Sequence, residues 1–451
     1  MKCLAPMVDG SDLPFRLLLN NVTHTWTPMY NCRALLNNTK WAQTIIDSIR
    51  FEKQNTDHIV VLQFATNSPS DLAAAYELLK DNDADFVEIN FGCAQSIAQR
   101  GGYGSYLLDD LPLCYELLKT LRDLAPNKKL SLKTRIFPQL HEFLQNAVDL
   151  HVDLITLHGR LKGLKLGCYS GPVDYDAISA ALASLQSCGA RQKCKFVLNG
   201  GIFSFKQHQQ FLEQGFDGTM SATFLLQNPF LYSNPDSQCE SPCDSQGVVS
   251  KHTLKNRTQQ QFSELIQKFQ KEKLAVESQL EKFRLQEDLK CKKVDFQQFN
   301  FMQTQKGSLS ADIQMRLEKE EIAAELAVQS LQTQQTNQQS TDQQTNQPQI
   351  VKLYLPKEEK LQILGAVLDL VELNEICIRQ NLEAPWSALL GHAFSMVGRD
   401  LLTKNVDLRW FLGLKNACAA DEDYYQVKRD GVRGAVVIFI ERMLNGVGCF
   451  K

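Results

Sequence analysis

The stretch that decides the fold is residues 59–90, IVVLQFATNSPSDLAAAYELLKDNDADFVEIN. Its first part, 59–64, is apolar and β-rich, and its last part, 86–90, has the same character. Between them, Ser68 and Pro69 precede an amphipathic segment at 70–80, and serine followed by proline is typical of a helix N-terminus. Strand, helix and strand in this order predict two parallel strands joined by a helix.

The same alternation continues on both sides of this stretch. Further β-rich runs occur at 2–7, 24–28, 130–134, 154–158, 195–198 and 218–221, and helical patterns occur at 113–124, 140–150, 174–187 and 205–214. Asp12, with Pro14 two residues later, also resembles a helix cap. An open doubly wound sheet is the alternative, but the sequence lacks the glycine fingerprint that would follow the first strand of a dinucleotide-binding sheet. Eight strands, by contrast, can close into a barrel. We therefore expect an α/β fold, a (β/α)₈ TIM barrel followed by a small all-helical bundle.

Three segments of the chain differ in composition. Residues 1–233 carry the barrel pattern. Residues 234–350 form a polar, helix-forming insertion that ends in a Gln-rich tract at 329–349, so we expect partial disorder. Apolar residues in this insertion do not sustain a heptad, which favours a surface helix over a coiled coil. Residues 351–451 predict a helical domain, with one stripe formed by Leu361, Leu364, Val367, Leu368, Val371 and Ile376.

Composition narrows the class of protein. The 451 residues include 48 Lys and Arg against 51 Asp and Glu, a net charge of −3 that excludes a histone-like protein. No apolar run approaches the roughly eighteen residues of a membrane span, and the amino terminus lacks a signal-peptide pattern. The 13 cysteines are then expected to be reduced, in a cytoplasmic or nuclear protein. Cys239 and Cys243 have no second Cys/His pair at zinc spacing, so we expect no metal.

Nearly every predicted strand ends in polar, titratable or glycine-rich residues. The active sites of β/α barrels lie at these carboxyl ends. The residues placed there are Ala5, Pro6, Met7, Gln63, Asn90, Cys93, Lys133, Arg135, His158, Arg160, Asn199, Gly200, Gly201, Ser221 and Ala222. A purely structural barrel would rarely show this pattern, so an enzyme is favoured.

Two of these strand ends predict a phosphate site. Glycines such as Gly200-Gly201 let backbone N–H groups approach phosphate oxygens, and barrels commonly hold a phosphate here, next to Ser221. A Gly-Gly pair alone is equally consistent with a simple turn. Gln63, Lys133 and His158 would add amide and cationic groups at a ring, which is how proteins tune a flavin. The alternative is that Lys133 and His158 belong to a salt-bridged scaffold.

Cys93 follows the fourth predicted strand and precedes the glycine-rich segment 101–104. A single cysteine is usually a small buried hydrophobic residue. At a strand end, beside a segment able to close over a substrate, its thiol can act as a general acid toward a carbanion-like centre.

Taken together, these motifs resemble the tRNA-dihydrouridine synthase family, and they occur in the family's order over nearly all of residues 3–231. The matching stretches are Ala5-Pro6-Met7-Val8-Asp9, Asp12 to Leu18, Thr27-Pro28-Met29-Tyr30, Val61 to Ala65, Ile89 to Cys93, Gly101 to Leu107, Lys133-Thr134-Arg135-Ile136, Thr156 to Arg160, Asn199 to Ile202 and Met220-Ser221-Ala222. The stretches at 100–104 and 133–138 are most similar to the eukaryotic branch that acts on D-loop positions 16 and 17.

This resemblance implies a flavin-dependent enzyme that reduces D-loop uridines of tRNA to 5,6-dihydrouridine. NADPH or NADH would reduce FMN, which would pass a hydride to uracil C6, while Cys93 would protonate C5. Asn90 would face the uracil. By the same resemblance, FMN would be held by Ala5, Pro6, Met7, Gln63, Lys133, His158, Asn199, Gly200, Gly201, Ser221 and Ala222.

The chain departs from the family pattern at two positions. Ala94 stands where a proline usually follows the cysteine, which questions the rigidity of the loop, and Thr223 replaces a usually charged residue. The insertion at 234–350 has no counterpart in that pattern. Two alternatives stay open: a small-molecule FMN-dependent pyrimidine reductase, which gives no reason for a helical domain, and a non-catalytic RNA-binding protein.

Basic residues outside the strand ends are candidates for RNA contacts. Arg399 and Arg409 flank a predicted loop of the helical domain, and phosphate contacts are the usual way in which a protein positions a nucleic acid. Arg160 lies at the expected rim of the barrel. We expect a monomer that binds tRNA and has no membrane contact.

Overall fold

The computed structural model describes residues 1–162, 173–187, 189, 192–233, 259–274 and 357–384, with short pieces at 392–393, 395–396, 434, 436–438 and 440–441. These residues all belong to one compact unit of the chain. The predictions for the Gln-rich tract at 329–349 and for Arg399 and Arg409 lie outside the described residues. The domain boundaries at 233 and 350 stay predictions.

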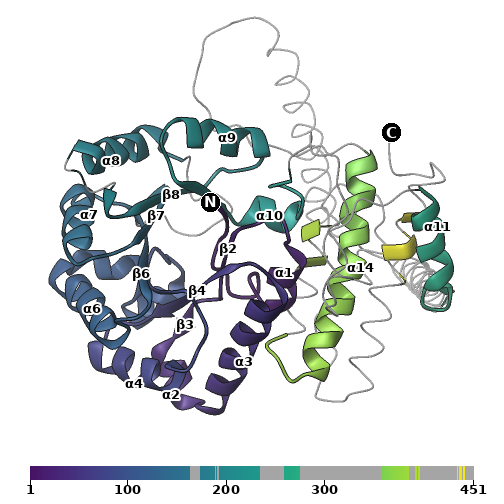
Figure 1. Cartoon of the computed structure of the whole chain (residues 1–451), viewed down its shortest axis with the longest axis horizontal. Helices are drawn as coiled ribbons and strands as arrows, with labels where there is room; N and C mark the ends of the chain where they lie inside the picture. The colour runs from purple at the N-terminus through teal and green to yellow at the C-terminus, as the bar shows by residue number, and fades with distance from the viewer. Residues whose placement is uncertain are drawn as a thin grey trace, which may run out of the picture. The chain divides into compact units, whose positions relative to one another are not determined.

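Eight parallel strands close into a ring, which confirms the predicted barrel (Figure 1). The ring closes because the first strand pairs with both the second and the last. The strands are β1 (Lys2–Leu4), β2 (His24–Trp26), β4 (Ile59–Ala65), β5 (Phe86–Phe91), β6 (Lys129–Ile136), β7 (Leu154–Leu161), β8 (Lys195–Asn199) and β9 (Gly218–Ser221). A two-residue strand, β3 (Tyr30–Asn31), pairs with the carboxyl end of β4.

Helices surround this ring and connect its strands, as Figure 1 shows. They are α1 (Leu13–Leu18), α2 (Cys32–Asn37), α3 (Lys40–Asn55), α4 (Pro69–Leu79), α5 (Ser96–Gly101), the 3₁₀ helix η1 (Gly104–Asp109), α6 (Leu111–Leu124), α7 (Leu140–Asp149), α8 (Tyr175–Ser187), α9 (Phe205–Glu213) and α10 (Thr223–Gln227). Two further helices are α11 (Gln259–Lys268) and α14 (Lys357–Arg379). No helix among the described residues is both long and apolar enough to cross a bilayer.

Side chains alternate between the inside of the barrel and its helix-covered outside. An apolar cluster inside the barrel consists of Cys3, Ala5, Trp26, Val61, Phe86, Leu154, Val197 and Met220. On β5, Phe91 points outward, where its ring contacts Phe143 of α7 with centroids 5.5 Å apart. Because successive side chains of a strand point to opposite faces, Glu88 and Asn90 share the inner face with Phe86. On β5 the inner face therefore begins with the apolar Phe86 and continues with polar side chains toward the carboxyl end.

The two predicted helix caps have different outcomes. Ser68 caps α4 as expected, with its Oγ accepting a hydrogen bond from the backbone N–H of Asp71 at 3.1 Å. Asp12 precedes α1, but its carboxylate makes no cap hydrogen bond. It instead contacts Nε2 of His392, whose ring stacks on Phe15 with centroids 4.3 Å apart. Asp12 is therefore at the predicted N-cap position with Pro14 in the first turn, but its carboxylate binds a buried imidazole from a distant part of the chain and not the helix N-terminus.

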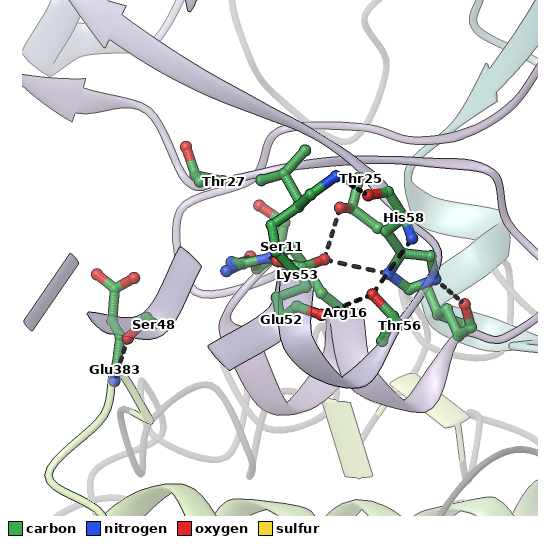
Figure 2. Close-up of polar contacts among 12 residues, drawn as sticks. Ser11, Arg16, Thr25, Thr27, Ser48, Glu52, Lys53, Thr56, His58 and Glu383 are labelled. Atoms are coloured by element: carbon green, nitrogen blue, oxygen red, sulfur yellow. Dashed lines mark hydrogen bonds and ion pairs between the residues drawn. The ribbon is translucent and has the colours of Figure 1, made fainter. Parts of the chain in front are cut away.

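A buried polar cluster joins α1, β2 and α3 beneath the barrel wall (Figure 2). We call Arg16, Thr25, Glu52 and His58 the Arg16 cluster. Nε of Arg16 donates to Oε2 of Glu52 at 2.7 Å, and Oγ1 of Thr25 donates to Oε1 at 2.6 Å. Nδ1 of His58 lies 3.1 Å from the same oxygen. Burial alone would raise the pKa of Glu52, but Arg16 and the hydrogen bonds lower it to about 2.

The helix α14 packs against α1 in the same unit. Of the predicted stripe, Leu361, Leu364, Val367, Leu368 and Val371 are buried, whereas Ile376 is only partly buried. Just after the helix, Glu383 accepts a hydrogen bond from the Tyr30 hydroxyl at 2.6 Å, and its backbone N–H donates to Ser48 at 2.8 Å. The start of the predicted helical region is therefore attached to the barrel through buried side chains.

Candidate active site

Strand pairing brings the predicted site residues to neighbouring inner positions at the carboxyl ends of the strands. Asn90 of β5 is paired with Lys133 of β6, and His158 of β7 is paired with Asn199 of β8. Gln63 of β4 is paired with position 88 of β5. Residues far apart in the sequence are thus gathered on adjacent strands, as the strand-end pattern predicts.

Glu88, which the sequence analysis did not select, lies at the centre of this inner face. It is fully buried, and its Oε1 accepts hydrogen bonds from Nε1 of Trp26 at 2.8 Å and from Nε2 of Gln63 at 2.6 Å. Its Oε2 accepts from the hydroxyl of Ser131. We call Trp26, Gln63, Glu88 and Ser131 the axial cluster. The available signal was an acidic residue at an inward position of an otherwise apolar strand.

Hydrogen bonds continue from the axial cluster to Cys93. Nδ2 of Asn90 donates to Oε1 of Gln63 at 2.8 Å. Oδ1 of Asn90 accepts the backbone N–H groups of Gly92 at 3.0 Å and Cys93 at 2.8 Å. Asn90 therefore holds the backbone of the cysteine loop, and its predicted contact with uracil stays a prediction.

Several further hydrogen bonds fix the Cys93 loop. The carbonyl oxygen of Cys93 accepts from the backbone N–H of Ser105 at 2.9 Å and from its hydroxyl at 3.1 Å. The Tyr106 hydroxyl donates to the carbonyl of Ala94 at 3.3 Å, and Nε of Arg135 donates to that of Gly92 at 2.6 Å. These contacts restrain the loop although Ala94 replaces the proline.

The environment of Cys93 favours a protonated thiol. The residue is partly buried, and burial raises the pKa of its thiol, while Arg135 and Lys133 act in the opposite direction. Gly104 touches this loop so closely that a Cβ at its position would lie 2.5 Å from the carbonyl oxygen of Cys93. A neutral S–H held beside a partly open surface can donate a proton, which agrees with the predicted general acid.

The pKa values of the basic side chains Lys133 and His158 are lowered in this site. Burial, followed by the neighbouring charge of Arg135, lowers the pKa of Lys133 to about 8, although Glu88 and Cys93 oppose the shift. Burial and nearby cations lower the pKa of His158 far below its ordinary value, so its imidazole is neutral near pH 7. Nη1 of Arg160 lies 2.9 Å from Nε2 of His158. A guanidinium can only donate, so Nε2 accepts and the ring hydrogen is on Nδ1.

The glycines after β8 form a close backbone surface. Gly200 and Gly201 have φ angles of 109° and 73°, which glycine adopts readily and other residues rarely do. A Cβ on Gly201 would lie 2.5 Å from the hydroxyl of Tyr175. Nearby, the Ser221 hydroxyl donates to the carbonyl of Ile202 at 2.9 Å. This surface has the small residues that a phosphate site requires.

Two buried polar atoms, one near the end of β6 and one in the first half of β7, fit a polar ligand. Within the described part of the chain, Nη1 of Arg135 and Oγ1 of Thr156 are buried and have no hydrogen-bond partner. Buried polar groups normally have partners, so these atoms fit a ligand such as a flavin with its ring and phosphate groups. Among the same described residues, no three His, Cys, Asp or Glu side chains form a metal-binding group.

The remaining predicted residues also lie at this end of the barrel. The backbone N–H of Ala5 donates to the carbonyl of Ser221 at 3.0 Å, which joins the ends of β1 and β9. Pro6 and Met7 follow Ala5 and are partly buried, and Ala222 precedes α10. A separate pocket of about 340 Å³ lies at the opposite end of the strands. Its lining includes Ile59, Phe86 and Lys129, which are the first residues of β4, β5 and β6.

Comparison with known proteins agrees with the sequence motifs. The family model described as dihydrouridine synthase (Dus) matches residues 3–325. The chain is 31% identical over 240 residues to tRNA-dihydrouridine(16/17) synthase (NAD(P)+) of Saccharomyces cerevisiae, covering 51% of this chain and 54% of that protein. It is 27% identical over 242 residues to the Schizosaccharomyces pombe protein of the same name, covering 52% and 58%.

A third relative is matched over a longer region. The rat protein named tRNA-dihydrouridine(16/17) synthase (NAD(P)+)-like is 28% identical over 322 residues, which cover 63% of this chain and 68% of that protein. The chain spans just over half the length of the two yeast relatives. The family model covers most of the chain, and its match runs from Cys3 in the first barrel strand through the last, β9. The chain therefore belongs to the dihydrouridine synthase family.

Proposed function

We propose that this protein is an FMN- and NAD(P)H-dependent enzyme that reduces uridines 16 and 17 in the D-loop of tRNA to 5,6-dihydrouridine. The relatives named above act on these positions by their names. The observation that carries the proposal is the hydrogen-bonded Cys93 loop beside the inner strand ends that present Lys133 and His158. An acid and a cofactor surface at one barrel mouth are what reduction of a uracil ring requires.

The proposed flavin site uses the strand ends described above. Gly200, Gly201 and Ser221 would face the phosphate, while Lys133 and the Nδ1–H of His158 would be donors to the ring. Bound FMN would accept a hydride from NADPH or NADH and deliver it to uracil C6. Its other proposed contacts are Ala5, Pro6, Met7, Gln63, Asn199 and Ala222.

Cys93 would supply the proton that C5 of uracil needs once C6 has received a hydride. The hydrogen bonds to its backbone hold the Cys93 loop in one place, so the loop needs no rearrangement before reaction. Arg135 and Lys133 would stabilise the thiolate that remains after transfer, because both favour the ionised sulfur. Solvent would then return a proton to the thiolate.

Substrate binding is proposed for Asn90 and Arg160 at the barrel and for Arg399 and Arg409 further along the chain. The two latter residues would contact phosphates and position the RNA. A uridine would have to leave its stack in order to reach the barrel mouth.

The test uses the purified full-length chain and transcripts of a tRNA with uridines at 16 and 17. We expect a yellow protein that contains FMN, oxidises NADPH faster when tRNA is added and converts these uridines to dihydrouridine. Matched transcripts with cytidine at both positions should not be modified. A colourless protein would favour the non-catalytic alternative, and reduction of free pyrimidines without any effect of tRNA would favour the small-molecule reductase.

A further inference from the structure

We propose that Glu88 is a positioning residue for the flavin site, because it sets the direction of the hydrogen-bond chain that runs to Cys93. It also lies beside Lys133, since Glu88 pairs with Ser131 and Lys133 is the next residue of β6 on the same inner face. This inference rests on the proposed function above. Glu88 lies below the residues assigned to the cofactor and substrate, and three other strands supply its hydrogen-bond donors.

Glu88 fixes the orientation of the Gln63 side-chain amide. The indole N–H of Trp26 can only donate, and an ionised carboxylate can only accept. Oε1 of Glu88 accepts from Trp26 and from Gln63, so the amide nitrogen of Gln63 must point toward Glu88. The amide oxygen of Gln63 is then directed to the other side.

The same order of donors and acceptors continues through Asn90 to the backbone of Cys93. With its oxygen turned away from Glu88, Gln63 accepts from Nδ2 of Asn90, so Oδ1 of Asn90 accepts the backbone N–H groups of Gly92 and Cys93. Those two backbone groups can only donate, so both ends of the chain require the same orientation. A donor in place of the Glu88 carboxylate would conflict with this order.

Glu88 also acts on the charge of Lys133. The groups that act on it or face it are Arg135 on its own strand, Glu88 on β5, Cys93 in the loop after β5 and His158 on β7. Glu88 is the carboxylate in this set, since Arg135 is a cation and the others are a thiol and a neutral imidazole. Burial already lowers the pKa of Lys133 to about 8, and loss of the Glu88 charge would lower it further.

The main test compares Glu88→Gln with Glu116→Gln, using the FMN-loaded full chain. Glu88→Gln removes the buried negative charge at nearly constant volume, whereas Glu116→Gln makes the same carboxylate-to-amide change at an exposed position of α6. We expect Glu88→Gln to shift the alkaline limb of flavin reduction by NADPH, measured without tRNA, to lower pH by about one unit. Its flavin midpoint potential should become more negative, because a cation near the ring favours the reduced form. Glu116→Gln should leave both near the wild-type values.

A second variant separates direction from charge and serves if Glu88→Gln does not fold. Glu88→Asp keeps the charge but withdraws the carboxylate from Gln63 and Trp26 by one methylene. We expect it to retain FMN and the alkaline limb, and to lose about tenfold in dihydrouridine formation, as expected when positioned groups are displaced by about an ångström. Unchanged turnover in Glu88→Asp would contradict the role of the hydrogen-bond chain.

The outcomes for this inference differ from those for the proposed function. A wild-type protein that binds no flavin or forms no dihydrouridine would refute the proposed function. If the wild type does both and Glu88→Gln keeps its alkaline limb and midpoint potential, only the positioning role of Glu88 is refuted. A similar shift in Glu116→Gln would also refute it, because that change is made at the surface and leaves the Glu88 carboxylate in place.

Discussion

Glu52 in the Arg16 cluster and Glu88 in the axial cluster are both fully buried in the same barrel, yet their pKa values move in opposite directions. Glu52 pairs directly with a guanidinium, and its pKa falls to about 2. Burial raises the pKa of Glu88, and its hydrogen bonds come from the neutral groups of Ser131, Trp26 and Gln63. The difference lies in the partner and not in the depth of burial.

This difference separates a structural site from a chemical one. In the Arg16 cluster the guanidinium of Arg16 and the carboxylate of Glu52 bind each other directly, and this ion pair joins α1 with α3. In the axial cluster the carboxylate acts on Lys133 through space, and its hydrogen bonds lead to Cys93. A buried acid with neutral partners and a cation nearby is thus a stronger sign of function than a buried ion pair.

The largest effect is expected at the end of the axial hydrogen-bond chain. Cys93→Ala should reduce dihydrouridine formation by about 10²–10⁴-fold, the usual contribution of a placed proton donor, while FMN content stays unchanged. Single-turnover assays with prereduced enzyme would measure this step directly. Cys114→Ala is the matched control for a buried thiol away from the site, and comparable activity in both variants would remove Cys93 from the mechanism.

The Arg16 cluster should affect folding more than chemistry. Glu52→Gln leaves Arg16 buried beside a neutral group, and removal of one partner from a buried ion pair costs about 3–5 kcal/mol. Urea unfolding would measure this loss in the free energy of unfolding. The protein that remains folded should reduce its flavin at the wild-type rate. A loss below about 1 kcal/mol would show that the pair contributes little.

The pH dependence of stability should have opposite signs for the two glutamates. The folded pKa of Glu52 is depressed from 4.5 to about 2, so its contribution is present above pH 4.5 and is lost as the pH falls toward 2. At 1.36 kcal/mol per unit, this is about 3 kcal/mol. Glu88 has a raised pKa, so it favours folding most at low pH and less as the pH rises above 4.5. Unfolding curves of Glu52→Gln and Glu88→Gln against wild type, taken across this pH range, test both signs.

The smallest effect is expected for an exposed ion pair. Nε of Arg33 lies 2.8 Å from Oδ2 of Asp71, and 69% of the Arg33 side chain is exposed to solvent. Arg33→Ala should change the free energy of unfolding by less than about 0.5 kcal/mol, with no change in flavin content. This variant provides the baseline for the two buried glutamates, and a loss similar to that of Glu52→Gln would mean that burial does not decide the energetics here.

The sequence predicts the barrel well because local patterns specify it. The predicted strand at 218–221 has the bounds of β9, while β6 and β7 extend two or three residues beyond their predicted carboxyl ends. The helix α3 was not predicted, although Ala42, Ile45, Ile46 and Ile49 lie at helical spacing after Thr39. No proline marks its start, in contrast to α4.

Partners from distant parts of the chain set the limit of such prediction. Asp12 carries a local capping signal, but His392 takes its carboxylate. Glu88 is visible as an acid in a strand, but its donors come from β2, β4 and β6, and no local pattern connects these strands. The strand ends, by contrast, needed only the parallel topology in order to be placed together.

The anchored Cys93 loop has a consequence for how binding energy can be used. Ordering a flexible residue costs about 1–2 kcal/mol of backbone entropy, and for this loop that cost is met during folding through its hydrogen bonds to Asn90, Ser105, Tyr106 and Arg135. An RNA that arrives at the barrel mouth would not have to order the proton donor. Its contact energy would remain available for unstacking a base, which itself costs a few kcal/mol.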